Sequence, residues 1–349
     1  MAQAIQMQRK NDSGVYENYY PNTVMSQVEG DIQVLAKIEI KTNNALGTIT
    51  VSNGESVSLN YDGNGFIYLK YGTYTFSMTK NSNTVTKTLI VDSIKKYILE
   101  MYDISKTLND NDWATIGAVS KAGLANSYWS IGDAKAINLN GTASKLSLNT
   151  TLYCYILGFD HDKSSESGAK DGITFGTFKT AASDGIDVCL VSGYSDDSDF
   201  RMNTTSTNSG GWKNSDMRYN ILGSTNTQNG DATSTTATSP KANTLMSCLP
   251  SDLRAVMRPM YIYTDNTGGG SDTASYVTGT LDYLPLLAEY EVYGTRTYAN
   301  SAEQNNQTQY AYYKNGNSKV KYNHSSTFST MAWWVRSPYS GNSDFFLLC

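Results

Sequence analysis

Two histidines are the first side chains to test for catalytic chemistry. His161 lies in Phe159-Asp160-His161-Asp162, where it could bind a metal ion or orient a general base, and His324 lies in a polar stretch. A histidine at the end of an apolar run more often caps a turn, and we favour that role for His161. The sequence has no Gly-x-Ser-x-Gly, His-Glu-x-x-His or phosphate-binding glycine motif. These patterns predict a protein that is not an enzyme.

Acidic and sulfur-containing side chains could bind a metal ion. Asp196-Asp197-Ser198-Asp199, with Asp184 and Asp187 before it, could gather oxygen ligands for calcium, but the spacing matches no EF-hand. A solvated acidic turn is the simpler interpretation. The cysteines are far apart and form no C-x-x-C pair; they are Cys154, Cys189, Cys248 and Cys349. We therefore expect mostly buried thiols, no metal and no cofactor.

A polar turn near the end of the chain is the best candidate for ligand binding. Tyr339-Ser340-Gly341-Asn342-Ser343-Asp344 follows Trp333-Trp334-Val335-Arg336-Ser337-Pro338 and precedes an apolar run. Antibody paratopes favour the same residue types, Tyr for contact area and Ser or Asn for adaptable hydrogen bonds. The candidate ligand-binding residues are Tyr339, Ser340, Asn342, Ser343, Asp344 and Arg336. For Arg336 the alternative is a pairing with a carboxylate or backbone carbonyls at the edge of the core. Four of the five tryptophans are expected in the core.

The composition limits the classes of function. A chain of 349 residues suggests two or three modules. Charged residues make up only 17% of it and the net charge is −5, so a nucleic-acid partner is not expected. The first ten residues lack the apolar core of a signal peptide, and no run of about 18 apolar residues predicts a membrane-spanning helix. Asn, Ser, Thr, Gly and 26 Tyr replace the missing charge, which resembles the surfaces of extracellular binders and virion proteins.

Three segments must position these residues. Residues 1–30 show no regular spacing of apolar residues, and we interpret them as an extended docking arm. Residues 31–101 contain short strand-like runs separated by turns every 8 to 12 residues, which is typical of an all-β, immunoglobulin-like sandwich. The predicted strands span residues 34–40, 47–51, 56–61, 65–70, 72–79 and 83–91.

Residues 102–349 mix strands with helices and predict an α+β domain. One helix is expected over residues 110–125, capped by Asp110 or Asn111, and another over 244–257, interrupted by Pro250 and restarted at Ser251 or Asp252. Predicted strands span residues 151–158, 173–179, 187–191, 261–264, 284–293 and 345–348. Residues 225–239 and 267–273 are predicted as flexible surface insertions.

Several motifs resemble known families. Residues 16–23, Tyr-Glu-Asn-Tyr-Tyr-Pro-Asn-Thr, resemble the start of tail-fibre and baseplate proteins of phages, and the Gly-Thr-Tyr hairpin at residues 72–74 resembles the PEGA sandwich. The last domain resembles a C-type-lectin-like family of phages and gut bacteria, some of whose members are targets of diversity-generating retroelements. The motifs behind that resemblance are residues 128–133 (Tyr-Trp-Ser-Ile-Gly-Asp), 155–161 (Tyr-Ile-Leu-Gly-Phe-Asp-His), 210–218 (Gly-Gly-Trp-Lys-Asn-Ser-Asp-Met-Arg), 286–294 (Leu-Leu-Ala-Glu-Tyr-Glu-Val-Tyr-Gly) and 333–338 (Trp-Trp-Val-Arg-Ser-Pro).

The resemblance implies a non-enzymatic phage protein made in the host cytoplasm and assembled into the virion, in a tail fibre or baseplate. The lectin-like head would mediate host attachment by receptor binding to a cell-surface protein or polysaccharide. The N-terminal arm would dock on other virion proteins, and a homo-oligomer, a trimer, would supply multivalency. A capsid or tail decoration and a cell-wall-acting enzyme are the alternatives. The family usually continues past this point, so the chain either is truncated or ends with residues 344–349 as its last strand.

Overall fold

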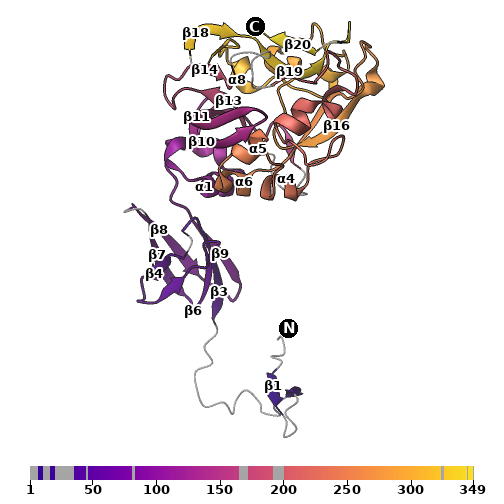
Figure 1. The fold of residues 1–349 in the computed structure, drawn as a ribbon. Helices are drawn as coiled ribbons and strands as arrows, with labels where there is room; N and C mark the ends of the chain where they lie inside the picture. The colour runs from indigo at the N-terminus through magenta and orange to yellow at the C-terminus, as the bar shows by residue number, and fades with distance from the viewer. Residues whose placement is uncertain are drawn as a thin grey trace, which may run out of the picture. The chain divides into compact units, whose positions relative to one another are not determined.

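The computed structural model describes residues 7–10, 16–19, 35–44, 46–80, 83–164, 172–191, 200–323, 326–343 and 345–348. The chain divides into two compact units, Met1–Met101 and Tyr102–Cys349. Among the described residues, the first unit contains only strands, and the second combines several sheets with short helices. The chain is therefore a β-rich protein with more than one compact unit (Figure 1).

Residues 35–101 of the first unit, where described, form two sheets around one core. A three-stranded sheet has the order β6-β3-β9 and a four-stranded sheet the order β5-β4-β7-β8. The strands are β3 (Ala36–Thr42), β4 (Thr48–Val51), β5 (Ser56–Ser58), β6 (Asn64–Leu69), β7 (Gly72–Lys80), β8 (Asn83–Val91) and β9 (Lys96–Met101). Ile38 and Ile40 of β3 share a buried cluster with Phe76 and Met78 of β7. Alternate side chains along each strand thus fill the space between the sheets.

Six of these strands lie close to their predicted bounds, and β9 was not predicted. Strand β9 pairs with β3 in parallel, so it needed a long connection rather than a local turn to reach its partner. The N-terminal segment contains a short hairpin of β1 (Met7–Lys10) and β2 (Tyr16–Tyr19). The remaining residues of the predicted docking arm lie outside the described residues.

The described strands of the second unit form three sheets. The largest has the strand order β10-β11-β13-β14-β17-β18, the second β12-β15-β16, and the third β19-β20. Its strands are β10 (Ala134–Ala143), β11 (Leu146–Phe159), β12 (Lys163–Ser164), β13 (Ile173–Lys179), β14 (Asp187–Cys189), β15 (Met260–Asp265), β16 (Val277–Asp282), β17 (Lys321–Asn323), β18 (Ser326–Met331), β19 (Trp333–Pro338) and β20 (Phe345–Leu348). The predicted last strand is β20, which pairs antiparallel with β19.

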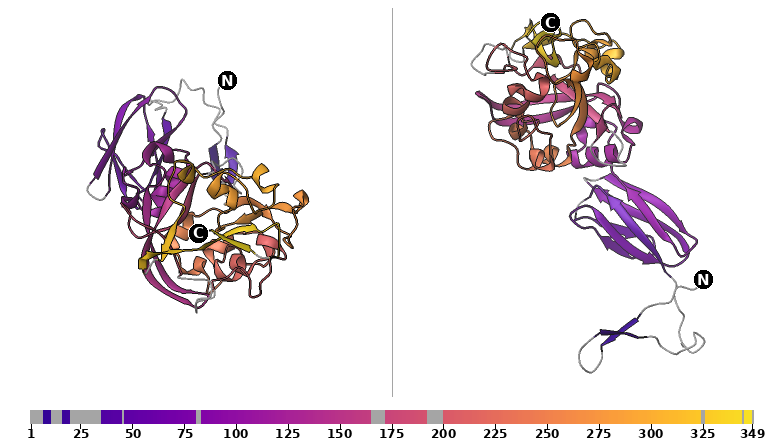
Figure 2. Two further views of the ribbon diagram at one scale, coloured as in Figure 1. Left: turned by 90° about the horizontal axis from the view of Figure 1, so that it is seen from above. Right: turned by 90° about the vertical axis from the view of Figure 1, so that its right-hand side faces the viewer.

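Short helices connect and flank these sheets. They are α1 (Trp113–Lys121), α2 (Ala125–Tyr128), α3 (Gly211–Asn214), α4 (Ser234–Thr238), α5 (Leu245–Cys248), α6 (Ser251–Val256), α7 (Glu289–Tyr293) and α8 (Ala311–Lys314). Single 3₁₀ or π turns span Leu108–Asp110, Met217–Ile221, Ala274–Tyr276 and Glu303–Asn305. Within this unit α1, α4 and α6 lie at one end and β18, β19 and β20 at the opposite end, and the side view agrees (Figures 1 and 2). Among the described residues, no helix is long and apolar enough to cross a membrane.

Two predicted helix starts need correction. Asp112 caps α1, because its carboxylate accepts the Thr115 N–H at 2.6 Å, whereas Asp110 and Asn111 were predicted as caps. Pro250 interrupts the second helical segment as predicted, but neither Ser251 nor Asp252 is its N-cap, since both lie inside α6.

The prediction of a strand over residues 284–293 is wrong, because residues 289–293 form α7. The Glu291 carboxylate accepts the Ala288 N–H at 2.9 Å and so satisfies one free donor at the start of the helix. Gly294, in the left-handed region with a φ of 68°, ends it. A local capping interaction thus outweighed the apolar run that suggested a strand.

The two predicted surface insertions are also packed more closely than expected. Within residues 225–239, Thr225, Ala232, Thr236 and Ala237 are buried, and residues 234–238 form α4. Within residues 267–273, Gly268 is buried against the neighbouring loop at Asn208. Small side chains made both segments look like flexible loops, but small side chains also allow close backbone packing.

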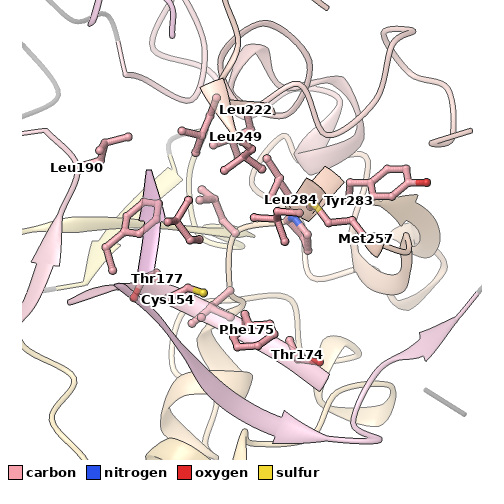
Figure 3. A pocket seen from close by; sticks show the side chains of 18 of the residues that line it. Cys154, Thr174, Phe175, Thr177, Leu190, Leu222, Leu249, Met257, Tyr283 and Leu284 are labelled. Atoms are coloured by element: carbon pink, nitrogen blue, oxygen red, sulfur yellow. The ribbon is translucent and has the colours of Figure 1, made fainter. Parts of the chain in front are cut away.

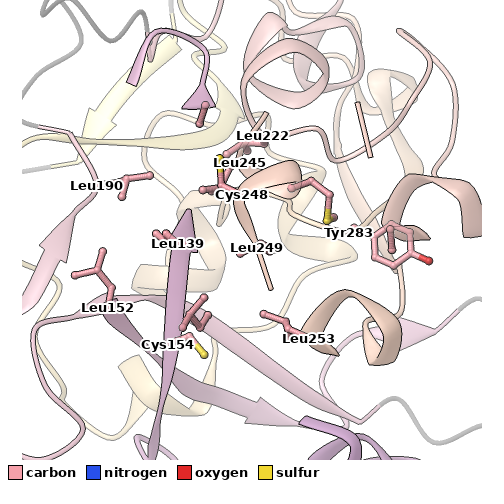
Figure 4. Packing of buried hydrophobic residues seen from close by; sticks show 14 of the residues in the cluster. Leu139, Leu152, Cys154, Leu190, Leu222, Leu245, Cys248, Leu249, Leu253 and Tyr283 are labelled. Carbon is pink, nitrogen blue, oxygen red and sulfur yellow. The ribbon is translucent and has the colours of Figure 1, made fainter. Parts of the chain in front are cut away.

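The core of the second unit is apolar and extends from the large sheet to the helices. Leu139, Leu152 and Cys154 from β10 and β11 belong to the same cluster as Leu245, Leu249 and Leu253, as the close view shows (Figure 4). Four tryptophans, Trp113, Trp129, Trp212 and Trp333, are buried, and Trp334 is half-buried. The prediction that four of the five pack in the core is confirmed.

Candidate functional site

The C-terminal turn, residues 339–343, connects β19 to the last strand and is held by a loop that is distant in sequence. The buried side chain of Asn208 donates Nδ2 to the carbonyl oxygens of Tyr339 and Asn342, at 3.3 and 3.2 Å. The backbone N–H of Asn208 donates to the Ser343 carbonyl at 2.6 Å. Its Oδ1 accepts the Gly269 N–H at 2.7 Å. One buried amide therefore fixes the C-terminal turn and the glycine loop at residues 268–270 together.

Tyr298 completes the exposed part of this surface. Its carbonyl accepts hydrogen bonds from both the N–H and the Oγ of Ser340, each at 2.9 Å. Its ring contacts the ring of Tyr339 edge to face, with centroids 5.4 Å apart, and the residue is 49% exposed. Asn342 and Ser343 are exposed, and Tyr339 and Ser340 are half-buried. We call Tyr298, Tyr339, Ser340, Asn342 and Ser343 the tyrosine surface.

A buried carboxylate holds the backbone that carries Tyr298. Glu289, the first residue of α7, accepts the N–H of Thr297 at 3.0 Å, of Tyr298 at 3.1 and 3.2 Å, and of Ala299 at 2.9 Å. The Glu289 N–H in turn donates to Ser337 Oγ at 3.2 Å. Hydrogen bonds to an ionised carboxylate are stronger than those to a neutral acceptor. The position of Tyr298 is therefore set from inside the unit.

A second carboxylate holds the glycine loop. Asp265, at the end of β15, accepts the N–H of Thr267 at 2.9 Å and of Gly268 at 2.8 Å, and its other oxygen accepts Asn300 Nδ2 at 2.9 Å. Its backbone N–H donates to the buried Glu303 carboxylate at 2.9 Å. Burial raises the pKa of Glu303 to about 7, although hydrogen bonds from the Asp265 N–H and the Ser337 hydroxyl act in the opposite direction.

Arg336 does not belong to the exposed surface. The residue is 1% exposed; both terminal nitrogens pair with the Glu291 carboxylate, and Nε donates to Thr264 Oγ1 at 2.7 Å. Burial by itself lowers the pKa of Arg336, but Glu291 outweighs it and raises that pKa above its ordinary value. Arg336 thus pairs with a carboxylate, as the alternative predicted, and its predicted role in ligand binding stays a prediction. Asp344 lies outside the described residues.

The described histidine has no nitrogen available for base catalysis. His161 Nε2 lies 2.9 Å from the Thr308 carbonyl oxygen, Nδ1 lies 3.2 Å from Asp162 Oδ1, and the ring stacks on Tyr310. Burial lowers the pKa of His161, but Asp162 outweighs it and leaves the pKa raised. Both nitrogens face acceptors, which a protonated ring satisfies. This residue acts in packing. His324 lies outside the described residues.

The structure also describes several of the acidic and sulfur-containing residues considered as metal ligands. Asp187 is buried and pairs with Lys179 at 3.3 Å, and Asp184 is exposed; residues 196–199 lie outside the described residues. In the described part of the chain, no three His, Cys, Asp or Glu side chains are grouped to hold a metal ion. Burial raises the pKa of Cys154, and it raises that of Cys189 to about 11, so neither thiol is a ready nucleophile.

Sequence reasoning found the C-terminal turn but missed Tyr298, Asn208 and Glu289. Helix α8 and the three strands β17, β18 and β19 lie between Tyr298 and Tyr339 in the sequence, and no local spacing links the two tyrosines. A signal for Glu289 existed, since an acidic residue at the start of an apolar segment favours a helix N-terminus.

Comparisons with known proteins give limited information. The sequence model of a family described as a domain of unknown function (DUF6273) matches residues 187–348, a segment that includes the whole tyrosine surface. A crystal structure of a DUF3823 family protein from Parabacteroides merdae shares 10% identity, with 35% of this chain and 57% of that chain covered and a TM-score of 0.19. The chain thus spans just over half of that neighbour's length, and the likeness is too slight to carry an argument. No curated protein matches.

Proposed function

We propose that residues 102–349 form a non-enzymatic binding head with a C-type-lectin-like fold, and that the tyrosine surface contacts a ligand on a host cell. The observation that carries this proposal is the Tyr298–Tyr339 ring pair, which is partly exposed. Its loops are anchored by the buried Glu289 carboxylate, which accepts the Tyr298 N–H, and by the buried Asn208 amide, which donates to the Tyr339 carbonyl. A surface held in place before binding loses little entropy on association. Partly exposed tyrosines beside serine and asparagine supply contact area and adaptable hydrogen bonds.

The other parts of the chain fit the same proposal. Residues 35–101, with two sheets around one core, are proposed as an immunoglobulin-like spacer, and the N-terminal residues as an attachment to a phage tail fibre or baseplate. Multivalent display on a virion would strengthen weak individual contacts. Tyr339, Ser340, Asn342, Ser343 and Asp344 are proposed as positions that a diversity-generating retroelement would vary.

The test is binding of labelled full-length protein to a panel of intact bacteria, before and after protease or periodate treatment. The double variant Tyr298→Ala with Tyr339→Ala removes the ring pair. We expect it to bind at least about tenfold more weakly, because removal of a central aromatic side chain commonly costs an interface that much affinity. Periodate sensitivity would assign the ligand to polysaccharide and protease sensitivity to protein.

The matched control is Phe328→Ala, which removes an aromatic ring that is 97% exposed on β18 of the same unit. It should bind like the unmodified protein. Folded protein that binds no strain of the panel, or a double variant that binds as well as the control, would contradict the proposal.

A further inference from the structure

A second feature of residues 102–349 is an apolar cavity of about 550 Å³. Strands β13 and β14 line one side of it, and residues 283–287 with α1 and α6 line the other. Figure 3 shows Phe175, Leu249, Met257 and Leu284 around it. The described residues of the tyrosine surface do not line this cavity, so its function is separate from the one proposed above.

The walls of the cavity are mostly aliphatic and aromatic, and many of the side chains that form them belong to the buried core, among them Trp113, Leu249 and Leu253. Water finds few hydrogen-bond partners in such a space, whereas an apolar molecule gains packing contacts with the walls. An empty void of this size would destabilise the fold, because the lining side chains would lack contacts on one side. The volume is in the range of pockets that enclose small molecules. The cavity therefore favours an apolar occupant.

The polar side chains of the lining form hydrogen bonds within the protein. Ser120 Oγ accepts the Ile173 N–H at 3.2 Å. Thr174 Oγ1 donates to Asp162 Oδ2 at 2.7 Å. The Cys189 thiol stays protonated at neutral pH, because burial raises its pKa to about 11. These groups therefore use their hydrogen-bonding capacity inside the protein, and they do not favour a polar ligand over an apolar one.

The charged side chains of the lining are also held within the protein. Among the described lining residues these are Arg258 and Lys321. Lys321 Nζ donates to Thr177 Oγ1 at 2.6 Å. Burial lowers the pKa of Lys321, and attraction to the Asp187 carboxylate acts in the opposite direction. Arg258 also interacts with another group of the protein. An ion that entered the cavity would lose its hydration without gaining a counter-ion of its own.

We propose that the cavity binds an uncharged long-chain lipid, whose hydrocarbon chain lies among the apolar side chains. Removal of the chain from water supplies the affinity. The cost of dehydrating a charge selects the uncharged lipid over an acid or an amine with a chain of the same length.

The experiment uses the full chain at neutral pH with Nile red, an uncharged fluorescent probe. Methyl laurate, laurate and dodecylammonium then compete for the probe at concentrations below those at which they form micelles. The three competitors have chains of the same length and are neutral, anionic and cationic. We expect saturable probe binding, and displacement by methyl laurate at concentrations at least about tenfold lower than either ion requires.

A larger side chain in the lining separates cavity binding from adsorption to the surface. Leu284→Trp places an indole at a half-buried position of the lining and should weaken binding of methyl laurate at least about tenfold. Met257→Trp, at a second half-buried lining position, replaces it if Leu284→Trp does not fold. The matched control is Leu124→Trp, at a leucine of the same unit that is 40% exposed and lies outside the lining. Circular dichroism checks the folding of each variant.

The control variant should bind methyl laurate like the unmodified protein. The proposal is overturned if the folded protein shows no saturable binding, or if laurate or dodecylammonium competes as well as methyl laurate. It is also overturned if a folded lining variant binds unchanged, or if Leu124→Trp loses as much affinity as the lining variant. None of these results bears on the tyrosine surface, which the cell-binding experiment tests.

Discussion

Replacing Glu289 with glutamine is the sharpest perturbation of the scaffold under the tyrosine surface. The carboxylate accepts N–H groups from three consecutive residues, Thr297, Tyr298 and Ala299. A glutamine amide keeps one acceptor oxygen and presents an NH₂ group, which cannot accept, where the other oxygen was. At least one backbone N–H then loses its acceptor, and the remaining hydrogen bonds are weaker because the acceptor no longer carries a negative charge.

The magnitude follows from these contacts. A hydrogen bond to a charged group contributes about 1.5 to 3 kcal/mol, and a buried donor left without an acceptor costs about 1 to 3 kcal/mol. We expect Glu289→Gln to lower the free energy of local opening of residues 297–299 by about 3 kcal/mol. Because about 1.4 kcal/mol corresponds to a factor of ten, the amides of these residues should exchange roughly a hundredfold faster.

Hydrogen exchange with mass spectrometry measures this directly. The control is Glu55→Gln, an exposed glutamate of the first unit, which should change stability by no more than about 0.5 kcal/mol and leave these amides unaffected. If residues 297–299 of Glu289→Gln exchange at the unmodified rate, the carboxylate does not hold the loop, and the explanation of how Tyr298 is positioned is refuted.

Three further predictions follow from the same region. Because burial raises the pKa of Glu303 from 4.5 to about 7, the folded state retains a proton that the unfolded chain releases between these values. Stability should therefore fall by about 3 kcal/mol as pH rises through this window, and urea unfolding of Glu303→Gln should lack that part of the dependence. Gly268→Ala would place a Cβ 1.8 Å from a buried carbonyl oxygen at a φ of +63°, whereas Gly269→Ala meets nothing within 4 Å at a φ of +82°. Thermal unfolding should show a larger loss of melting temperature for the first, and equal losses would contradict the packing described. Arg336→Ala should cost about 3 to 5 kcal/mol in denaturant unfolding because it leaves the Glu291 carboxylate buried without its partner, and a loss below about 1 kcal/mol would show that the pair is not buried.

The sequence predicted the local elements better than the long-range pairings. The alternation of apolar and polar residues, together with the turn residues between runs, predicted six strands of the first unit. These signals are local in the sequence. Strand β9 was missed, since its parallel pairing with β3 depends on contacts across the unit. The strand prediction for residues 289–293 relied on the apolar run and did not take into account the acidic residues at the start of α7, which favour a helix.

The candidate site was predicted only in part for the same reason. The residue types of the C-terminal turn indicated a contact surface, and the alternative for Arg336 described its carboxylate partner. The sequence pattern could not show that Tyr298 lies beside the C-terminal turn, because the two segments are more than 40 residues apart. It could not show that Asn208 holds the turn either, because that contact joins residues more than 130 positions apart. The cavity beside Arg258 likewise depends on how distant elements pack.

The most direct test of the central claim is a hydrogen-exchange footprint of the full-length protein bound to cell-wall polysaccharide or surface protein from a strain that it recognises. A ligand on the tyrosine surface should slow the exchange of amides in residues 297–299 and 339–343 and leave β18 unchanged. Slower exchange confined to other parts of the chain, with these two segments unaffected, would contradict the claim.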